Sequence, residues 1–363
     1  MEKNKKKVLH LLPRFVFGGA EILVLEYARR FDRERFELRV AAVRKNGDLE
    51  PYLKEAGVDT FAISRKRDGG LWWQWLALKK YVQAFQPDII HSHIFSADVC
   101  AFLLKRFVMP KVKWVSTQHN VEYNTPLYRR LLWSLVLQQA DKVIAVSEEV
   151  RHYAREYFGV RKDQLDFVPN GISIEKWLAV PEWTPRSAEW RLATIGRLEY
   201  QKGHRYLVEA LAKIKDLPWR WDVYGAGSLE IYLKELVKKY GLTERVHWHG
   251  AIGEMEDKIG EMDMIIQPSL WEGMSLVVME AMAAGRLLIA TQTAGKELVE
   301  HGENGHLVLE KDSAELAQVI KYYFENPKEV ERLARNAREY ARHHFDIKDN
   351  VAGVEEIYEE LDD

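Results

Sequence analysis

The sequence predicts an α/β protein built from two Rossmann-like, doubly wound domains. Short apolar runs alternate with helical patterns along the chain, which is typical of βαβ units and parallel sheets. The 363 residues also exceed the size at which one hydrophobic core usually keeps growing. A proline- and glycine-containing stretch without sustained periodicity, residues 169–187, separates two series of such units. We therefore expect an N-terminal domain over residues 1–180 and a C-terminal domain over 181–363, and leave open that the last helix crosses back to the first domain.

The predicted strands are short runs rich in β-branched and other apolar residues. In the first half they are residues 8–12, 36–43, 88–93, 113–118 and 142–147. In the second half they are residues 191–196, 220–225, 245–250, 263–268 and 287–291. Because ligands of open parallel sheets bind beyond the carboxyl ends of the strands, we expect the two domains to face a cleft lined by strand-end loops.

Composition and charge exclude several classes of protein. With 47% hydrophobic and 30% charged residues, and no apolar run as long as a membrane span, the chain is expected to be globular and not transmembrane. The apolar run after the N-terminal lysines is too short for a signal peptide, and the single cysteine, Cys100, cannot form an internal disulfide. Both features suit the cytoplasm. The basic first half is compatible with nucleic acid, an anionic membrane or a phosphorylated ligand, but no nucleic-acid recognition motif accompanies it, so we expect no nucleic-acid partner.

The segment PSLWEGMSLVVMEAMAAG carries the strongest chemical signal. It predicts a loop followed by a helix, whose first N–H groups, at Met274, Ser275 and Leu276, form a natural site for a phosphate. Glu272 in the loop would accept hydrogen bonds from sugar hydroxyls, and Glu280 in the helix would accept them from a ribose. Spacing alone leaves open that Glu272 is a turn residue and that Glu280 lies on a solvated helix face.

Gly18 and Gly19 lie between the first predicted strand and a helix. Their loop can bring backbone N–H groups close to a phosphate or an acceptor. A dinucleotide-binding dehydrogenase uses a glycine loop at the same place, but its fingerprint requires a third glycine and an acid about twenty residues later. FGGAEIL lacks the third glycine, so the loop gives little support to hydride transfer.

The segment that contains Glu272 and Glu280 resembles the signature of glycosyltransferase family 4, a family of retaining enzymes with the GT-B fold. Other segments resemble further motifs in the family's order: FGGAE, VPNGI, GRLEYQKG and HGENGHLV. The resemblance implies that Arg197 and Lys202 bind the donor diphosphate. Their position after a predicted strand suits two cations that neutralise a departing nucleoside diphosphate. Without the resemblance, both residues could be ordinary surface cations.

The expected donor-binding set also includes Gly225 and Ile252, and the resemblance gives His119 a catalytic contact with the donor sugar. Gly225 belongs to the turn GAGS, where the family commonly has an acid, which leaves a contact from this turn open. His91 and His93 end another predicted strand. We expect strand alternation to send them to opposite faces, so that at most one of them meets a ligand and a structural role is the alternative for each.

These residues predict a retaining, hexosyltransferase-type glycosyltransferase whose catalytic residues are His119, Arg197, Lys202 and Glu272. It would move a hexose-type sugar from a nucleotide-sugar, UDP-sugar first and GDP-sugar next, to a hydroxyl of a glycan or a lipid-linked acceptor. Since no carboxylate is identified for a double displacement, we favour a same-face substitution. The sequence has no Asp-x-Asp pair, so neither a metal nor another cofactor is expected. The alternatives are a sugar-nucleotide epimerase or hydrolase on the same fold and a non-catalytic nucleotide-sugar-binding protein.

Aromatic and basic residues gather in two predicted helices of the N-terminal domain, where the family binds its acceptor. Such helices can lie at an anionic membrane, which would suit a lipid-linked acceptor at the inner membrane face. The alternative is that the tryptophans fill the core while the cations face water. The residues concerned are Trp72, Trp73 and Trp75 with Lys79 and Lys80, and Arg129 and Arg130 with Trp133.

Overall fold

The computed structural model describes residues 5–44, 47–62, 70–123, 125–185, 189–253 and 255–361, with the backbone alone at 70–74. The chain divides into two compact units. The first comprises Met1–Asn170 with Ile347–Asp363, and the second comprises Gly171–Asp346.

This division falls earlier than the expected boundary near residue 180. Ile172 forms a bridge with Asp346, and Trp177 is buried in a core cluster of the second unit. Ile172 and Trp177 therefore pack with the second unit, although they lie in a stretch that has the composition of a linker.

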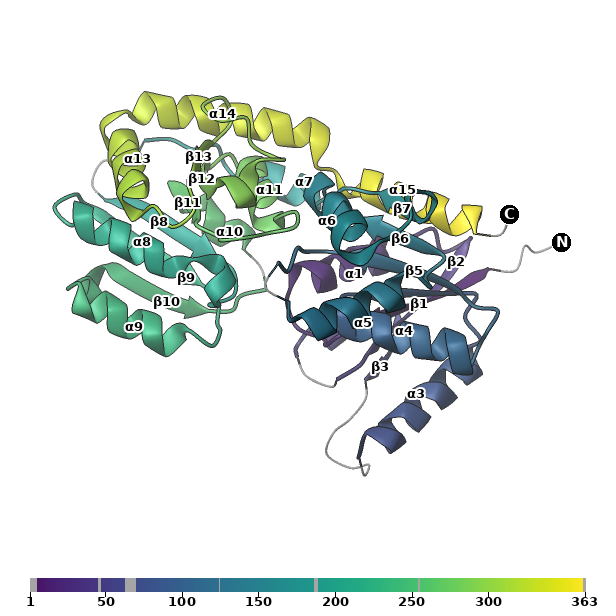
Figure 1. Ribbon diagram of the computed structural model, residues 1–363. Helices are drawn as coiled ribbons and strands as arrows, with labels where there is room; N and C mark the ends of the chain where they lie inside the picture. Colours follow the sequence, from purple (N-terminus) through teal and green to yellow (C-terminus); the bar gives the residue numbers. More distant parts are fainter. Residues whose placement is uncertain are drawn as a thin grey trace. The chain divides into compact units, whose positions relative to one another are not determined.

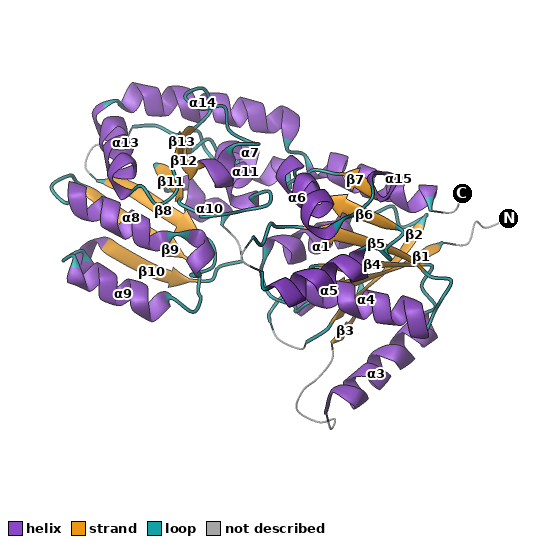
Figure 2. Ribbon diagram, in the orientation of Figure 1, coloured by secondary structure: helices purple, strands orange, loops and turns teal. Residues whose placement is uncertain are grey.

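The first unit contains a seven-stranded sheet in the order β3-β2-β1-β4-β5-β6-β7, and every neighbouring pair is parallel. Helices accompany the strands of this sheet (Figure 2). Its elements are β1 (Lys6–Leu12), α1 (Gly19–Arg30), β2 (Phe36–Ala42), α2 (Glu50–Glu55), β3 (Asp59–Ala62), α3 (Gly70–Phe85), β4 (Ile89–His93), α4 (Phe95–Phe107), β5 (Lys113–Gln118), α5 (Leu127–Leu137), β6 (Lys142–Ala145), α6 (Glu148–Phe158), β7 (Leu165–Phe167) and α15 (Ile347–Glu360).

The second unit contains a six-stranded parallel sheet in the order β10-β9-β8-β11-β12-β13. Figure 1 labels most of its elements. The elements are α7 (Ile174–Leu178), β8 (Trp190–Ile195), α8 (His204–Leu211), β9 (Trp219–Tyr224), α9 (Glu230–Lys239), β10 (Val246–Gly250), α10 (Glu256–Gly260), β11 (Met264–Gln267), α11 (Leu276–Ala283), β12 (Leu287–Thr291), α12 (Gln292–Gly295), β13 (His306–Val308), α13 (Ser313–Glu325) and α14 (Pro327–His344).

The prediction of two parallel-sheet α/β domains is confirmed. Central strands of such sheets are covered on both faces, so they read as continuous apolar runs and their residues are buried throughout. β12 is an example, since all five of its residues are buried. The short strands β3 and β7, which lie at the two edges of the first sheet, were not among the predicted strands.

Helix α15 belongs to the first unit, which it joins at the far end of the chain. Its apolar side chains share a core with β1, α1 and β2. The Asn350 amide donates to the carbonyl of Pro169 at 2.6 Å and accepts from the Tyr27 hydroxyl at 2.9 Å. The last helix is thus held in the first unit by both apolar packing and buried hydrogen bonds.

Candidate functional site

The strand order of the second sheet reverses between β8 and β11, which run side by side although they are not consecutive. At such a switch point the loops after the two strands diverge and leave room for a ligand. The loop after β8 carries Arg197 and Lys202, and the loop after β11 carries Glu272. Three of the four expected catalytic residues therefore follow the two strands at which ligands of this type of sheet bind.

Lys202 and Glu272 form an ion pair, with 2.6 Å between Nζ and Oε1. Their side chains are only 12% and 10% exposed. The same Oε1 also accepts a hydrogen bond from the Ser269 hydroxyl at 2.7 Å and from the Gln267 amide at 3.5 Å. The carboxylate is thus held through one oxygen, and no hydrogen bond within the described parts of the chain uses Oε2.

Gly203 allows the two loops to meet. It lies at φ +63°, and a Cβ on it would stand 2.0 Å from the carbonyl oxygen of Pro268. Next to it, the N–H of Leu270 donates to the carbonyl of Gln201 at 2.7 Å, and the Gln201 amide donates to the carbonyl of Trp271 at 2.9 Å. A glycine at this position lets backbone pack on backbone, which fixes the loop of Lys202 against the loop of Glu272.

Arg197 is exposed and close to the same loop. Its guanidinium donates to the Gln201 side chain at 3.2 Å, so the group that joins the two loops also holds the arginine. Among the described residues this is the one hydrogen bond of the guanidinium, whose other donors can bind a phosphate in a bidentate manner.

Helix α11 begins beside Glu272, as the sequence predicts. Ser275 is its N-cap, with φ −78° and ψ 112°, and the Ser275 side chain makes no capping hydrogen bond. Met274 precedes this residue and Leu276 opens the helix. The first turn therefore presents its dipole end without a side-chain cap from Ser275, which is the arrangement that favours an anion.

Glu280 lies one turn into α11 and is partly buried. Burial raises the pKa of its carboxyl to about 7, while the Lys176 charge lowers it and the Glu256 charge raises it further. Lys176 and Glu256 form an ion pair with each other. Near neutral pH, Glu280 therefore carries a proton for part of the time, which distinguishes it from a glutamate on a solvated helix face.

Gly225 and Ile252 follow β9 and β10. Gly225 lies at φ +151°, and a Cβ on it would stand 1.9 Å from the carbonyl oxygen of Gly196. Packing of the loops after β8 and β9 thus accounts for this glycine without a ligand. Ile252 is 36% exposed. In the GAGS turn, Ser228 donates from its backbone and hydroxyl groups to the Glu199 carboxylate at 3.0 and 2.6 Å.

In the first unit, Gly18 and Gly19 lie at the start of α1, in the loop that follows β1. The first sheet also reverses its order beside this strand, between β1 and β4. Gly18 is extended, and a Cβ on it would stand 2.5 Å from a carboxylate oxygen of Glu21. This glycine therefore makes room for a glutamate side chain of its own helix.

His119 directly follows β5 and is partly exposed. Its Nε2 lies 2.9 Å from Nδ1 of His93, and burial lowers the pKa of its imidazole to about 3, so the ring is neutral. The expectation that His91 and His93 point to opposite faces is wrong. Residues two apart in a strand share a face, and the two rings stack with centroids 4.4 Å apart.

For one of the two aromatic and basic helices, the structure bears out the alternative that its tryptophan fills the core. Trp133 of α5 is buried, and its indole donates to Asp98 at 2.9 Å, so this tryptophan belongs to the core. The side chains of Trp72 and Trp73 lie outside the described residues, and Trp75 is partly buried. The opposite face of α5 exposes apolar side chains instead, which are 47% to 76% exposed: Leu127, Tyr128, Leu131, Leu132 and Leu135.

The sequence analysis missed these apolar residues because it considered only the tryptophans and the cations. The spacing of the apolar residues, three and four positions, marks one helix face. The sequence analysis also missed Gln201, Gln267 and Ser269, which lie in or beside the recognised segments but have no charge. Across the described residues, the structure contains no helix with the length and apolar character needed to span a membrane.

Known proteins resemble this chain over nearly its whole length. The family model described as Glycosyltransferase Family 4 matches residues 17–176, and the model described as Glycosyl transferases group 1 matches residues 189–326. The putative glycosyltransferase EpsD of Bacillus subtilis is 26% identical over 365 residues, which cover 93% of each protein. Glycogen synthase of Mycobacterium tuberculosis is 26% identical over 290 residues, which cover 76% of this chain and 69% of that protein. Among solved structures, Anabaena HepE in complex with UDP-glucose has a TM-score of 0.87 at 21% identity, covering 98% of this chain and 99% of HepE.

Proposed function

The chain belongs to glycosyltransferase family 4 and has the GT-B fold, and on this premise we propose that it is a retaining hexosyltransferase that uses a nucleotide-sugar donor. The preferred donor is a UDP-sugar, with a GDP-sugar next. The acceptor is a hydroxyl of a glycan or of a lipid-linked molecule. HepE, which shares the fold, was crystallised with UDP and with UDP-glucose, which supports the choice of base.

The observation that carries this proposal is the Lys202–Glu272 pair at the switch point of the second sheet. The ammonium of Lys202 is held by the carboxylate of Glu272 at 2.6 Å in a largely buried position. A diphosphate placed at the start of α11 would share the Lys202 ammonium with Glu272 and take the exposed guanidinium of Arg197. Two cations and a helix N-terminus would then stabilise the charge that develops on the leaving group.

The two glutamates act as acceptors of hydrogen bonds from hydroxyl groups. Glu272 is fixed through Oε1, so Oε2 can accept from a sugar hydroxyl without loss of the contacts to Ser269 and Lys202. Glu280 accepts from the ribose. Carboxylates suit diols because ionised oxygens only accept.

The reaction is a same-face substitution. The bond between the anomeric carbon and the donor phosphate oxygen breaks, the acceptor oxygen forms the new bond on the same face, and the released phosphate oxygen takes the proton of the acceptor hydroxyl. Arg197 and Lys202 neutralise the nucleoside diphosphate, so the reaction proceeds without a metal. His119 contacts a hydroxyl of the donor sugar.

Nucleotide release from a panel of UDP-, GDP- and ADP-sugars, with and without candidate acceptors, tests the proposal. We expect release that depends on the acceptor and persists in a chelator. Release that does not depend on any acceptor would favour the hydrolytic alternative. Glu272→Gln, which keeps the shape of the side chain and removes the charge, is the matched variant for the donor site.

The exposed apolar face of α5 supports a lipid-linked acceptor at the inner membrane face. Five large apolar side chains on one helix are unusual for a surface in contact only with water. Arg130 of the same helix lies 5.6 Å from the centre of the Tyr157 ring and adds positive charge to it. Apolar insertion with nearby cations matches the surface of an anionic membrane.

A further inference from the structure

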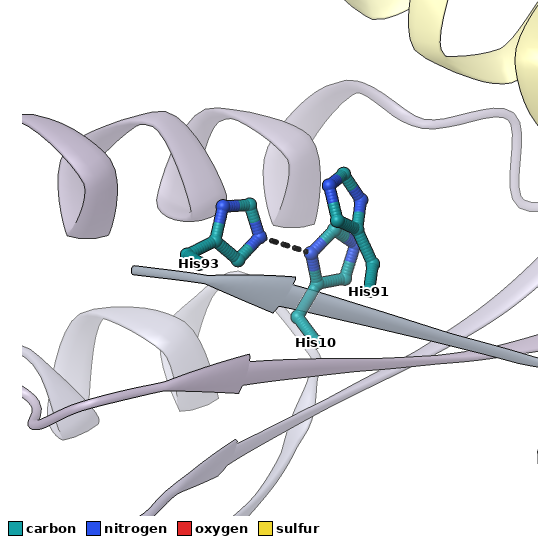
Figure 3. A group of neighbouring side chains, drawn as sticks. All are labelled: His10, His91 and His93. Atoms are coloured by element: carbon teal, nitrogen blue, oxygen red, sulfur yellow. Dashed lines mark hydrogen bonds between the residues drawn. The ribbon is translucent and has the colours of Figure 1, made fainter. Parts of the chain in front are cut away.

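Three buried histidines meet at the switch point of the first sheet. His10 lies on β1 and is the register partner of His91 on β4, and His93 follows on the same face of β4. All three side chains are fully buried. Figure 3 shows the three rings together, with a hydrogen bond between His10 and His93.

These histidines belong to a continuous series of hydrogen bonds that ends at His119. Nε2 of His119 contacts Nδ1 of His93 at 2.9 Å. Nε2 of His93 contacts Nδ1 of His10 at 3.1 Å. Nε2 of His10 contacts the hydroxyl of Tyr358, on helix α15, at 3.4 Å.

The series continues beyond Tyr358. The hydroxyl of Tyr358 contacts Nδ1 of His91 at 2.5 Å, and Nε2 of His91 contacts the hydroxyl of Thr117 at 2.6 Å. We call the six residues of this series the relay: His119, His93, His10, Tyr358, His91 and Thr117. Helix α15 supplies one member of it, so the return of the chain to the first unit completes this polar network.

A metal site is the obvious other interpretation of His10, His91 and His93, whose nitrogens lie within 4.8 Å of one another. However, each of their six ring nitrogens already has a partner in the relay. A metal ion would have to replace several of these buried hydrogen bonds. The relay therefore explains the cluster without an ion.

The relay has a direction because its members are neutral. Burial lowers the pKa of His10 to about 3 and, together with neighbouring histidine charges, lowers the pKa of His91 and His93 well below the usual value. A neutral imidazole carries one N–H donor and one acceptor nitrogen, so each proton position sets the next one.

The contact between Tyr358 and His91 sets the direction. The Tyr358 hydroxyl has one proton, and of its two imidazole contacts the one to His91, at 2.5 Å, is much shorter than the one to His10, at 3.4 Å, so we place the proton on the His91 side. With the Tyr358 hydroxyl donating to His91, the Tyr358 oxygen accepts from Nε2–H of His10. His10 Nδ1 then accepts from Nε2–H of His93, and His93 Nδ1 accepts from Nε2–H of His119.

We propose that His93, His10 and Tyr358 are positioning residues that hold His119 in its Nε2–H tautomer, so that its Nδ1 is an acceptor for a substrate hydroxyl. The proposal rests on the proposed contact of His119 with the sugar. No described residue is hydrogen-bonded to Nδ1 of His119. A lone pair at this atom suits a hydroxyl, which donates readily to a neutral imidazole.

Loss of the Tyr358 hydroxyl should reverse the relay. In Tyr358→Phe, Nε2–H of His10 would be a buried donor without a partner, which is more costly than a buried nitrogen without a proton. His10 would instead carry its proton on Nδ1, His93 would do the same, and His119 would become the Nδ1–H tautomer. Thr117→Val should act in the same way from the other end, because it removes the acceptor for Nε2–H of His91.

The tautomer of His119 can be measured directly. Two- and three-bond ¹H–¹⁵N couplings in labelled protein distinguish the two tautomers, and loss of the signal in His119→Ala assigns it. We expect Nε2–H in the wild type and Nδ1–H in Tyr358→Phe and Thr117→Val. Tyr27→Phe is the matched control, since it removes a buried hydroxyl bonded to Asn350 at 2.9 Å and leaves the relay intact.

Kinetics supply a second readout. Tyr358→Phe should lower kcat/KM about fivefold, the effect of one net hydrogen bond, and should have no further effect in a His119→Ala background. An equal effect in both backgrounds would mean that Tyr358 acts only on stability.

Three results would overturn the relay: Nδ1–H at His119 in the wild type, the same tautomer in wild type and both variants, or stoichiometric zinc in the purified protein. Wild-type turnover of His119→Ala would instead overturn the proposed sugar contact, and the coupling measurement would still decide whether the relay exists.

Discussion

Glu280 gives the sharpest test of the donor site, because the same burial affects both stability and binding. Burial raises the pKa of its carboxyl from 4.5 to about 7. The folded state therefore holds this proton more tightly than the unfolded state, and stability falls as the pH rises from about 4.5 to 7. For a fully buried group this difference would amount to about 3 kcal/mol, and for a partly exposed side chain we expect about 1 to 2 kcal/mol.

Glu280→Gln removes the ionisation and should therefore stabilise the protein above neutral pH. Urea denaturation should show a higher free energy of unfolding than the wild type at about pH 8, by about 1 to 2 kcal/mol, and a much smaller difference at about pH 5. Glu256→Gln is the matched control. Burial opposes ionisation there too, but the hydrogen bond from Lys176 lowers the pKa of Glu256, so this variant should lose stability at about pH 8.

Donor binding by the wild type should strengthen as the pH rises, whereas its stability falls. If the ribose requires the ionised form of Glu280, the apparent affinity scales with the ionised fraction, which rises from about one tenth at pH 6 to about nine tenths at pH 8 for a pKa of about 7. Calorimetric titration with a UDP-sugar should show about a tenfold gain over this range, and Glu280→Gln should bind weakly at both values. Affinity that does not change with pH in the wild type, or a Glu280→Gln variant no more stable at about pH 8, would refute this reasoning.

Three further changes have expected outcomes. Lys202→Met should lower acceptor-dependent nucleotide release at least about 100-fold, and turnover that stays unchanged with donor binding intact would contradict charge neutralisation by this residue. Gly203→Ala should lower the free energy of unfolding in urea by about 3 kcal/mol, because its Cβ would meet a carbonyl at 2.0 Å, whereas Gly241→Ala, at φ +69° with open space around it, should lose only about 1 kcal/mol. Joint substitution of Leu131 and Leu135 by serine should weaken co-sedimentation with anionic vesicles at least about tenfold, and undiminished binding would show that α5 is not the contact.

The central strands could be predicted from the sequence because both of their faces are covered. Burial on both faces leaves a continuous apolar run, as in β12. The edge strands β3 (Asp59–Ala62) and β7 (Leu165–Phe167) have only four and three residues, and their burial is incomplete. Their strand conformation depends on the neighbouring strand, which no local pattern reveals.

The candidate site could be predicted as a set of residues but not as a set of contacts. Lys202 and Glu272 are 70 positions apart, and their pairing depends on β8 and β11 being neighbours in the sheet. The hydrogen bonds of Gln201 and Ser269 depend on the same pairing of β8 with β11. Sequence motifs indicated which side chains carry charge, whereas the order of the strands decides which of them meet.

The sequence could not decide whether the tryptophans are in the core or at a surface. A tryptophan between arginines in a helical pattern fits an interfacial helix as well as a core helix, because the indole is both apolar and a donor. Trp133 is in the core because Asp98, also buried, accepts its N–H together with hydrogen bonds from Ser92 and Ser116. Only the position of this carboxylate, which comes from another helix, decides between an interfacial helix and a core helix.

Both sheets place buried ionisable groups at the point where their strand order reverses. In the first sheet these are His10 and His93, and in the second they are Lys202 and Glu272. Apolar side chains at these positions would avoid the desolvation of charged and polar groups, so stability alone does not explain their presence. Each of the two clusters is instead held by hydrogen bonds that leave one acceptor atom available: Oε2 of Glu272 in the second sheet, and Nδ1 of His119 at the end of the relay in the first. A site built in this way keeps its acceptor atoms oriented before the substrate binds, and the tautomer of His119 is the part of this arrangement that can be measured without any substrate.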